Sequence, residues 1–214
     1  MISKKNSGFE KSYFQNYRTE TLPYLYGVKI REAIKGISKK DPVLDIGCAT
    51  GMVLSRLDKD GFQTYGLDIS KFALLRAKEV TKAHLQFANV NQRLPFSQNY
   101  FGAVLALDII EHLDSPINFC REAERVLKPK GLFLLHTPNI NSIFEKIFGK
   151  KWFGYQDKSH LYLFNKKSLQ YLLSQAGFKI LTIETISYPV PVIFRQFLVG
   201  TEIGGSLWVV AEKA

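Results

Sequence analysis

The segment Val43–Gly51 (VLDIGCATG) combines residue types that favour binding of a nucleoside-like ligand. Gly47 and Gly51 allow a strand to turn sharply into a helix, and small side chains leave the backbone amides at the positive end of that helix open to a ligand. Asp45, near the end of the strand, can accept a hydrogen bond from a cationic or hydroxyl group. Asp68 follows 23 residues later, at the end of the next expected strand, where a carboxylate can bind both hydroxyls of a ribose.

The spacing within this segment excludes two common phosphate-binding motifs. The dinucleotide fingerprint GxGxxG requires a third glycine that is missing here, and no Gly-Lys-Ser or Gly-Lys-Thr follows as a P-loop requires. A simpler alternative stays open, in which both aspartates cap helices and the glycines only form turns.

Histidine is the side chain best suited to take a proton near neutral pH. His112 follows Glu111 shortly after an expected strand, and His160 lies near Asp157 in an aromatic segment. We expect both histidines to act as catalytic residues, either as a base or by orienting a substrate. The alternatives are that His112 braces the neighbouring loop and that His160 belongs to a lid or hinge. No pair among the four histidines has ligand spacing such as HxxxH, so the sequence predicts no metal site.

Length and composition place the chain among single-domain globular proteins. It has 214 residues, of which 46% are hydrophobic, enough to form a sizeable core. The longest apolar stretches are about half the roughly 20 residues that a membrane-spanning helix needs, and no apolar run follows the basic N-terminus as in a signal peptide. Cys48 and Cys120 are too few for a disulfide framework, which favours a reducing compartment and a cytoplasmic location.

The net charge of +10 comes from the two flanks of the chain, whereas residues 42–140 are almost neutral. This distribution argues against a nucleic-acid partner and favours a solvated, lysine-rich surface. An acidic substrate or an anionic membrane surface stays open as an alternative.

Short β-rich runs alternate with helical patterns, which predicts βαβ units and a doubly wound, mostly parallel α/β sheet. The last two strands have no helix between them and should form an antiparallel hairpin. Residues 1–40 are expected to form a helical cap and substrate lid, and residues 41–214 the main domain, with an insertion at about 140–165 after the fifth strand. The expected strands are 42–47, 62–67, 85–88, 101–107, 132–136, 178–187 and 206–212, and the expected helices are 9–17, 21–37, 50–59, 71–82, 116–127 and 167–176.

Five segments in the same order resemble the motifs of class I S-adenosylmethionine-dependent methyltransferases, the broad group that includes ubiquinone-biosynthesis and related small-molecule enzymes. The resemblance extends from residue 41 to about 183 and implies a Rossmann-like fold of seven strands. The segments are VLDIGCATG (43–51), GLDIS (66–70), RLPFSQNYFGAVLALDIIEHLDSP (93–116), LKPKGLFLLHTPN (127–139) and HLYLFNKKSLQYLLSQAGF (160–178).

The resemblance implies S-adenosylmethionine as the cofactor and a set of residues that bind it. The loop after the first strand would hold the methionine part, Asp68 the ribose, and Ile69 the adenine. This chain has Asn89 and Val90 where the family often has an acid for the adenine amino group, and Ala49 where a glycine is common. The residues implied in cofactor binding are Asp45, Gly47, Cys48, Ala49, Gly51, Asp68, Ile69, Asn89, Val90 and Leu107.

Open α/β sheets bind ligands outside the carboxyl ends of their strands, so residues after the fourth and fifth strands should face a cleft. These residues are Asp108, Glu111, His112, His136, Thr137 and Asn139. Aromatic residues of the N-terminal segment and the insertion are candidates for a lid over a methyl acceptor, or for ordinary core at the sheet edge: Tyr13, Tyr17, Trp152 and Tyr155. Lys150, Lys151 and Lys158 would suit an acidic acceptor.

The function expected from the resemblance is methyl transfer to a small molecule, with oxygen as the expected atom and a glycan, lipid-linked or quinone-like acceptor. Two alternatives stay open: an RNA methyltransferase, and a non-catalytic partner subunit that binds the cofactor. The segment 188–199 is expected to pack as a buried hairpin, with contact to a membrane surface as the alternative.

Overall fold

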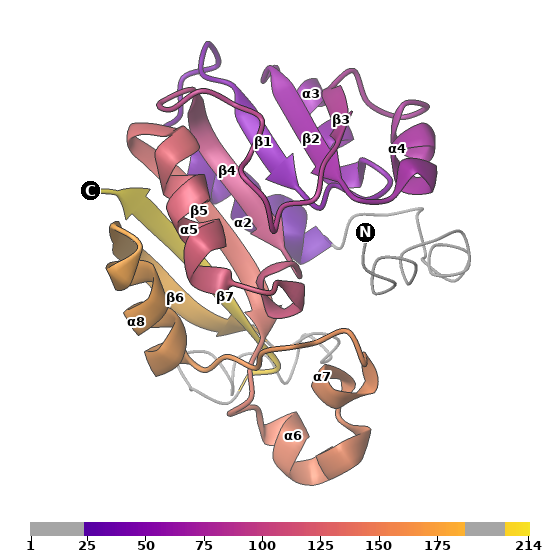
Figure 1. Ribbon diagram of the computed structural model, residues 1–214, viewed down its shortest axis with the longest axis vertical. Helices are drawn as coiled ribbons and strands as arrows, with labels where there is room; N and C mark the ends of the chain where they lie inside the picture. The colour runs from indigo at the N-terminus through magenta and orange to yellow at the C-terminus, as the bar shows by residue number, and fades with distance from the viewer. Residues whose placement is uncertain (1–23, 187–203) are drawn as a thin grey trace.

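The computed structural model describes residues 24–186 and 204–214. Within them, seven strands form one sheet in the order β3-β2-β1-β4-β5-β7-β6 (Figure 1). This confirms the predicted mostly parallel, doubly wound sheet. The strands are β1 (Val43–Ile46), β2 (Thr64–Asp68), β3 (His84–Phe87), β4 (Phe101–Leu107), β5 (Leu127–Pro138), β6 (Phe178–Ile186) and β7 (Ser206–Lys213).

Strands β1 and β4, at the centre of the parallel half of the sheet, are buried on both faces because helices cover both sides. β1 pairs in parallel with β2 and β4, and β4 with β5. The first six residues of β4 are buried, as expected for a central strand. The carboxyl ends of these strands therefore meet at one edge, where the site described below lies.

The two last strands are antiparallel, as predicted. β7 lies between β5 and β6 and runs opposite to both. Its inner position buries Trp208 and Val209, whereas β6 forms the edge of the sheet.

Helices lie on both faces of the sheet (Figure 1). On one face, α5 and α8 contribute Phe119, Cys120, Leu169 and Leu173 to the larger core cluster. On the other face, α2 and α3 pack with β1, β4 and β7 in a second cluster. The helices are α2 (Tyr24–Ile34), α3 (Met52–Lys59), α4 (Lys71–Ala77), α5 (Pro116–Val126), α6 (Ile143–Phe148), α7 (Phe153–Gln156) and α8 (Lys166–Gln175), with short 3-10 turns η2 (Ile110–His112) and η3 (Gly149–Lys151).

Two elements differ from the sequence prediction. Helix α4 begins after its predicted N-cap, Ser70, but ends at Ala77 instead of reaching residue 82. The side chain of Asp58 accepts hydrogen bonds from the Thr81 hydroxyl and the Lys82 amide, which fixes this segment outside a helix. The predicted turn at 128–131 lies within β5, as an irregularity at which the pairing with β4 jumps from Leu127 to Leu132.

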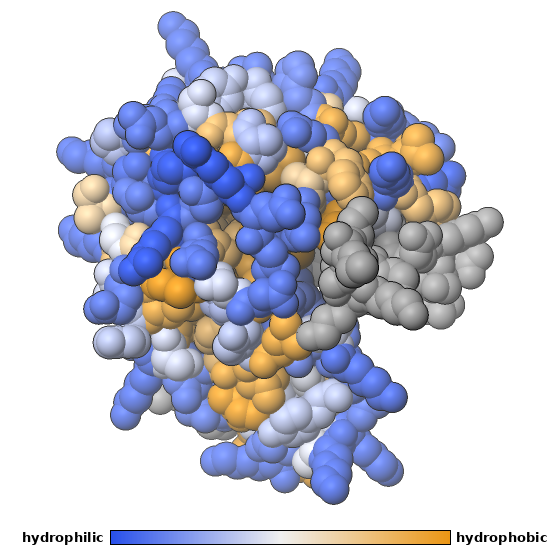
Figure 2. Space-filling model, in the orientation of Figure 1, coloured by the Kyte–Doolittle hydropathy of each residue, from blue (hydrophilic) through white to orange (hydrophobic). Residues whose placement is uncertain are grey.

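The insertion after β5 forms α6, η3 and α7 beyond the carboxyl end of that strand (Figure 1). Hydrophilic side chains predominate on the face shown in Figure 2, with an apolar patch among them toward the end of the molecule where the insertion lies. Among the helices in the described ranges, none has the length and apolar character needed to cross a membrane. The predictions for Tyr13, Tyr17 and the segment 188–199 fall outside the described residues.

Candidate active site

A cavity of about 580 Å³ opens at the carboxyl ends of β1, β2, β4 and β5. It extends from the loop after β1 to the insertion, and its walls combine backbone, carboxylates, imidazoles and apolar side chains. The lining residues in the described chain are Tyr26, Gly47, Ala49, Asp68, Ile69, Ala88, Asn89, Val90, Asn91, Leu107, Asp108, Ile109, Glu111, His112, Leu113, His136, Pro138, Phe153, Asp157, His160, Ile186 and Ser206.

The loop after β1 winds through left-handed backbone conformations at three alternate residues. The φ angles of Gly47, Ala49 and Gly51 are +72°, +46° and +80°. A methyl group on Gly47 would lie 2.0 Å from the side chain of Ile109, so the wall of the cavity requires a glycine there. Ala49 adopts the left-handed conformation despite its side chain, at the position where the family often has glycine.

Asp68 holds this loop against the next strand. One of its carboxylate oxygens accepts the Ala49 amide at 2.8 Å, and the other accepts the Ser70 amide at 2.7 Å. The N-cap positions of α3 and α4 are occupied by Gly51 and Ser70, so neither aspartate caps a helix as the alternative raised by the sequence would require. Each oxygen can accept more than one hydrogen bond, and Asp68 also lines the cavity, so its carboxylate can still bind a ligand.

Asp45 lies behind the loop and is only 3% exposed. Burial, and then the nearby charge of Asp68, raise the pKa of Asp45 to about 8. Cys48 is buried beside it, and burial followed by the charge of Asp45 raises the pKa of its thiol, which keeps it protonated. Asp45, Cys48 and Gly51 thus lie behind the cavity lining and form its support.

A second wall of the cavity comes from the residue after β2, from the loop after β3 and from the end of β4. Ile69, Asn89, Val90 and Leu107 all line the cavity there, and their role in cofactor binding stays a prediction. Asn89 also shapes its own loop, since its side-chain oxygen accepts the Asn91 amide at 3.0 Å.

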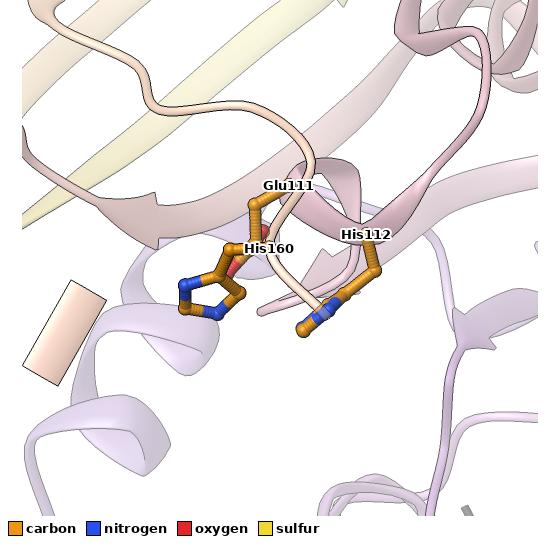
Figure 3. Close-up of side chains that lie close together, drawn as sticks. All are labelled: Glu111, His112 and His160. Carbon is orange, nitrogen blue, oxygen red and sulfur yellow. The ribbon is translucent and has the colours of Figure 1, made fainter. Parts of the chain in front are cut away.

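Glu111, His112 and His160 form a compact cluster in the wall of the same cavity (Figure 3). One donor atom from each lies within 4.8 Å of the others, and the two imidazole rings are 4.7 Å apart between centroids. Glu111 comes from η2, and its carbonyl accepts the amides of Leu161 and Tyr162. These hydrogen bonds fix the loop that carries His160 against η2.

The electrostatics of this cluster are dominated by burial. Burial, and then the charge of Asp108, raise the pKa of Glu111 well above its usual range. Burial, and then His160, lower the pKa of His112. The imidazole of His112 is therefore neutral at pH 7.

A second polar group lies beside this cluster and was only partly anticipated. Nδ1 of His136, at the end of β5, is 2.8 Å from a carboxylate oxygen of Asp108. The hydroxyl of Tyr26 in α2 lies 3.0 Å from Nδ1 and 3.1 Å from Nε2 of the same ring. The sequence placed Asp108 and His136 at the cleft but gave no signal for Tyr26, because it sits in a helix far from any motif.

Other predicted residues lie away from the cavity lining. Thr137 is buried and donates to Glu111 at 3.0 Å, and Asn139 donates to the Gly204 carbonyl at 2.8 Å. Trp152 is buried within the insertion and Tyr155 is exposed, whereas Phe153 lines the cavity. The lid role of Trp152 and Tyr155 stays a prediction. The lysines at 150, 151 and 158 are exposed and do not line the cavity.

Comparison with known proteins places this site in a family. Residues 18–183 match the family described as "Methyltransferase domain". The chain belongs to this family, and its sheet is that of class I S-adenosylmethionine-dependent methyltransferases.

Individual relatives share part of the chain. The ubiquinone biosynthesis O-methyltransferase of Bradyrhizobium diazoefficiens is 34% identical over 104 residues, which cover 46% of this chain and 40% of the relative. Cycloartenol-C-24-methyltransferase 1 of Oryza sativa is 29% identical over 136 residues, 56% of this chain and 40% of the relative. The chain therefore spans about 40% of the length of these curated relatives.

The fold is also found in solved structures. A SAM-dependent methyltransferase from Archaeoglobus fulgidus superposes with a TM-score of 0.69 at 20% identity, over 88% of this chain and 93% of the other. This similarity supports the fold.

Proposed function

We propose that the chain transfers a methyl group from S-adenosylmethionine to a hydroxyl oxygen of a small, mainly apolar acceptor. The observation that carries this proposal is one cavity that joins the loop at Gly47 and Ala49 to the cluster of Glu111, His112 and His160. Such a cavity can hold a nucleoside cofactor and an acceptor end to end.

The residues present fit S-adenosylmethionine. When bound, it supplies a methyl group on a sulfonium, which is already activated for displacement. The cofactor end of the cavity is lined by carboxylate and open backbone, as a cationic nucleoside requires. In this proposal Asp68 holds the ribose, and Ile69 and Val90 flank the adenine.

In this proposal the loop after β1 binds the amino-acid part of the cofactor. Gly47 and Ala49 present backbone to the cavity, with Cys48 and Gly51 packed behind them, and Asp45 supplies a buried carboxylate that a nearby ammonium would ionise. Asn89 and Leu107 complete the wall. These assignments follow the family resemblance, residue by residue.

The remaining task of the protein is to align the acceptor oxygen with the methyl group of the cofactor. In-line displacement requires the acceptor oxygen close to the methyl carbon, opposite the sulfur, and such positioning can lower a barrier by roughly 7–11 kcal/mol. His112 and His160 are the groups we propose to hold the acceptor oxygen, because they line the same cavity.

The walls of the acceptor end favour an apolar ring or chain that carries hydroxyl groups. Leu113, Pro138, Phe153 and Ile186 supply apolar contacts there. Lysine and arginine are absent from the cavity lining in the described ranges, which argues against an acidic acceptor. A hydroxylated aromatic compound resembling a quinone precursor fits these features better than a glycan, in keeping with the name of the Bradyrhizobium relative.

A methyl-transfer assay with labelled cofactor tests the proposal. Hydroxylated aromatic compounds, glycans and tRNA are offered as acceptors, and we expect label only in the first group. Replacing Phe153 with Ala should raise the KM for the acceptor and leave the affinity for S-adenosylhomocysteine unchanged. Label transferred to tRNA, or none to any hydroxylated acceptor, would contradict the proposal.

A further inference from the structure

We infer that Glu111, His112 and His160 form a binding site for one divalent transition-metal cation, such as Zn²⁺, Mn²⁺ or Co²⁺, at the acceptor end of the cavity. Two imidazoles and one carboxylate are a common donor set for these ions. The sequence predicted no metal site, because Glu111 and His112 come from η2 whereas His160 follows the insertion after β5, and the three have no recognisable ligand spacing. The fold brings them within 4.8 Å of one another.

The carboxylate of Glu111 is the strongest indication of a ligand. The side chain is 1% exposed, and Oε2 accepts a hydrogen bond from Thr137 at 3.0 Å. Among the described residues, Oε1 has no hydrogen-bond partner. A buried carboxylate oxygen without a partner is costly, and a bound cation would satisfy it.

The hydrogen bonds of His160 prepare it to bind a cation. Its Nδ1 lies 2.7 Å from the carbonyl oxygen of Gly154. A carbonyl can only accept, so Nδ1 carries the proton and Nε2 carries the lone pair. This arrangement, in which one ring nitrogen donates to a carbonyl, orients histidine ligands in many metal sites.

His112 is oriented by a similar chain of hydrogen bonds. The hydroxyl of Ser159 donates to Asp157, so its oxygen accepts from Nδ1 of His112 at 2.9 Å. The same tautomer results, with the lone pair on Nε2. In both rings the hydrogen bond at Nδ1 therefore assigns Nε2 as the nitrogen that would bind a metal.

Distances and charge agree with this inference. Metal bonds of about 2.1 Å place neighbouring ligand atoms roughly 3.0–3.5 Å apart, so the widest separation in the cluster, up to 4.8 Å, needs to contract by roughly 1–2 Å. Asp108 and Asp157 line the cavity around the cluster and make it attractive to a cation. Three protein ligands leave coordination positions open toward the cavity, where a hydroxyl oxygen of the acceptor can bind. This last role rests on the proposed function, whereas cation binding itself does not.

The test uses the untagged full chain after removal of metals with a chelator. Co²⁺ is titrated and followed by visible absorption and by calorimetry, and we expect one Co²⁺ per chain. The variants Glu111→Gln and His160→Gln should each weaken binding at least 100-fold, because a ligand is lost. Ser159→Ala should weaken it about 10-fold, because His112 loses its orienting partner. His84→Ala, an exposed histidine on β3, is the matched control and should bind like the parent chain.

Thermal melting and binding of S-adenosylhomocysteine report whether each variant is folded. If Glu111→Gln does not fold, the Co²⁺ affinities of His160→Gln and Ser159→Ala decide the test. Parent-like Co²⁺ binding by His160→Gln, or no binding by the parent chain below millimolar Co²⁺, overturns the inference and leaves the proposed function intact. If the parent chain binds Co²⁺ but does not bind S-adenosylhomocysteine, the proposed function is overturned and the metal site is not.

Discussion

Replacing Asp45 with Asn should remove a pH dependence from the stability of the ligand-free chain. Because burial raises the pKa of Asp45 to about 8 from a usual value of 3.8, the folded chain keeps a proton that the unfolded chain releases. The contribution of Asp45 to the free energy of unfolding is fully present below pH 3.8 and decreases as the pH rises toward 8. One retained proton corresponds to about 1.4 kcal/mol per pH unit, or about 3 kcal/mol between pH 5 and 7.

Urea unfolding at pH 5, 6, 7 and 8 measures this effect. The two proteins should have similar unfolding free energies near pH 4, because Asn resembles a protonated Asp in shape. The Asp45→Asn variant should be the more stable by about 1.6 kcal/mol at pH 5 and by about 4 kcal/mol at pH 7. Asp60→Asn, which removes a surface partner of Arg31 and Arg56, should leave the pH slope unchanged. Parallel pH profiles for the parent chain and Asp45→Asn would refute the reasoning.

Three further variants test the cofactor loop. Gly47→Ala should destabilise the chain by about 1–3 kcal/mol and abolish S-adenosylhomocysteine binding, because the added methyl group meets Ile109. Urea unfolding measures the first effect and calorimetry the second. If the double variant Gly47→Ala/Ile109→Ala recovers no stability, the steric cause is contradicted. Ala49→Gly should raise the unfolding free energy by up to about 1 kcal/mol, because it relieves a left-handed alanine; a loss of stability in urea would contradict this. Asp68→Asn should weaken S-adenosylhomocysteine binding about 10- to 100-fold in calorimetry, and the control Asp60→Asn should bind like the parent chain. An unchanged affinity of Asp68→Asn would exclude Asp68 from the ribose site.

The sheet and the cofactor loop could be predicted because their signals are local. Strand β4 has the predicted bounds, and Ser70 and Ser115 precede their helices as expected. The end of α4 could not be predicted, because it depends on hydrogen bonds that Thr81 and Lys82 donate to Asp58, which lies in another helix, α3.

The acceptor end of the site could be predicted only in part. His112 and His160 were recognised as candidates from their chemistry, but their proximity depends on the path of the insertion, which has no periodic pattern. Phe153 lines the cavity while its neighbours Trp152 and Tyr155 do not, and local sequence does not distinguish the three. Tyr26 reaches His136 only through the packing of α2 on the sheet.

A crystal structure of the chain grown with S-adenosylhomocysteine tests the central claim most directly. We expect the ribose hydroxyls on Asp68, the adenine beside Ile69 and Val90, and the sulfur directed toward Glu111 and the two histidines. A nucleoside bound elsewhere, or a sulfur directed away from that cluster, would contradict the account.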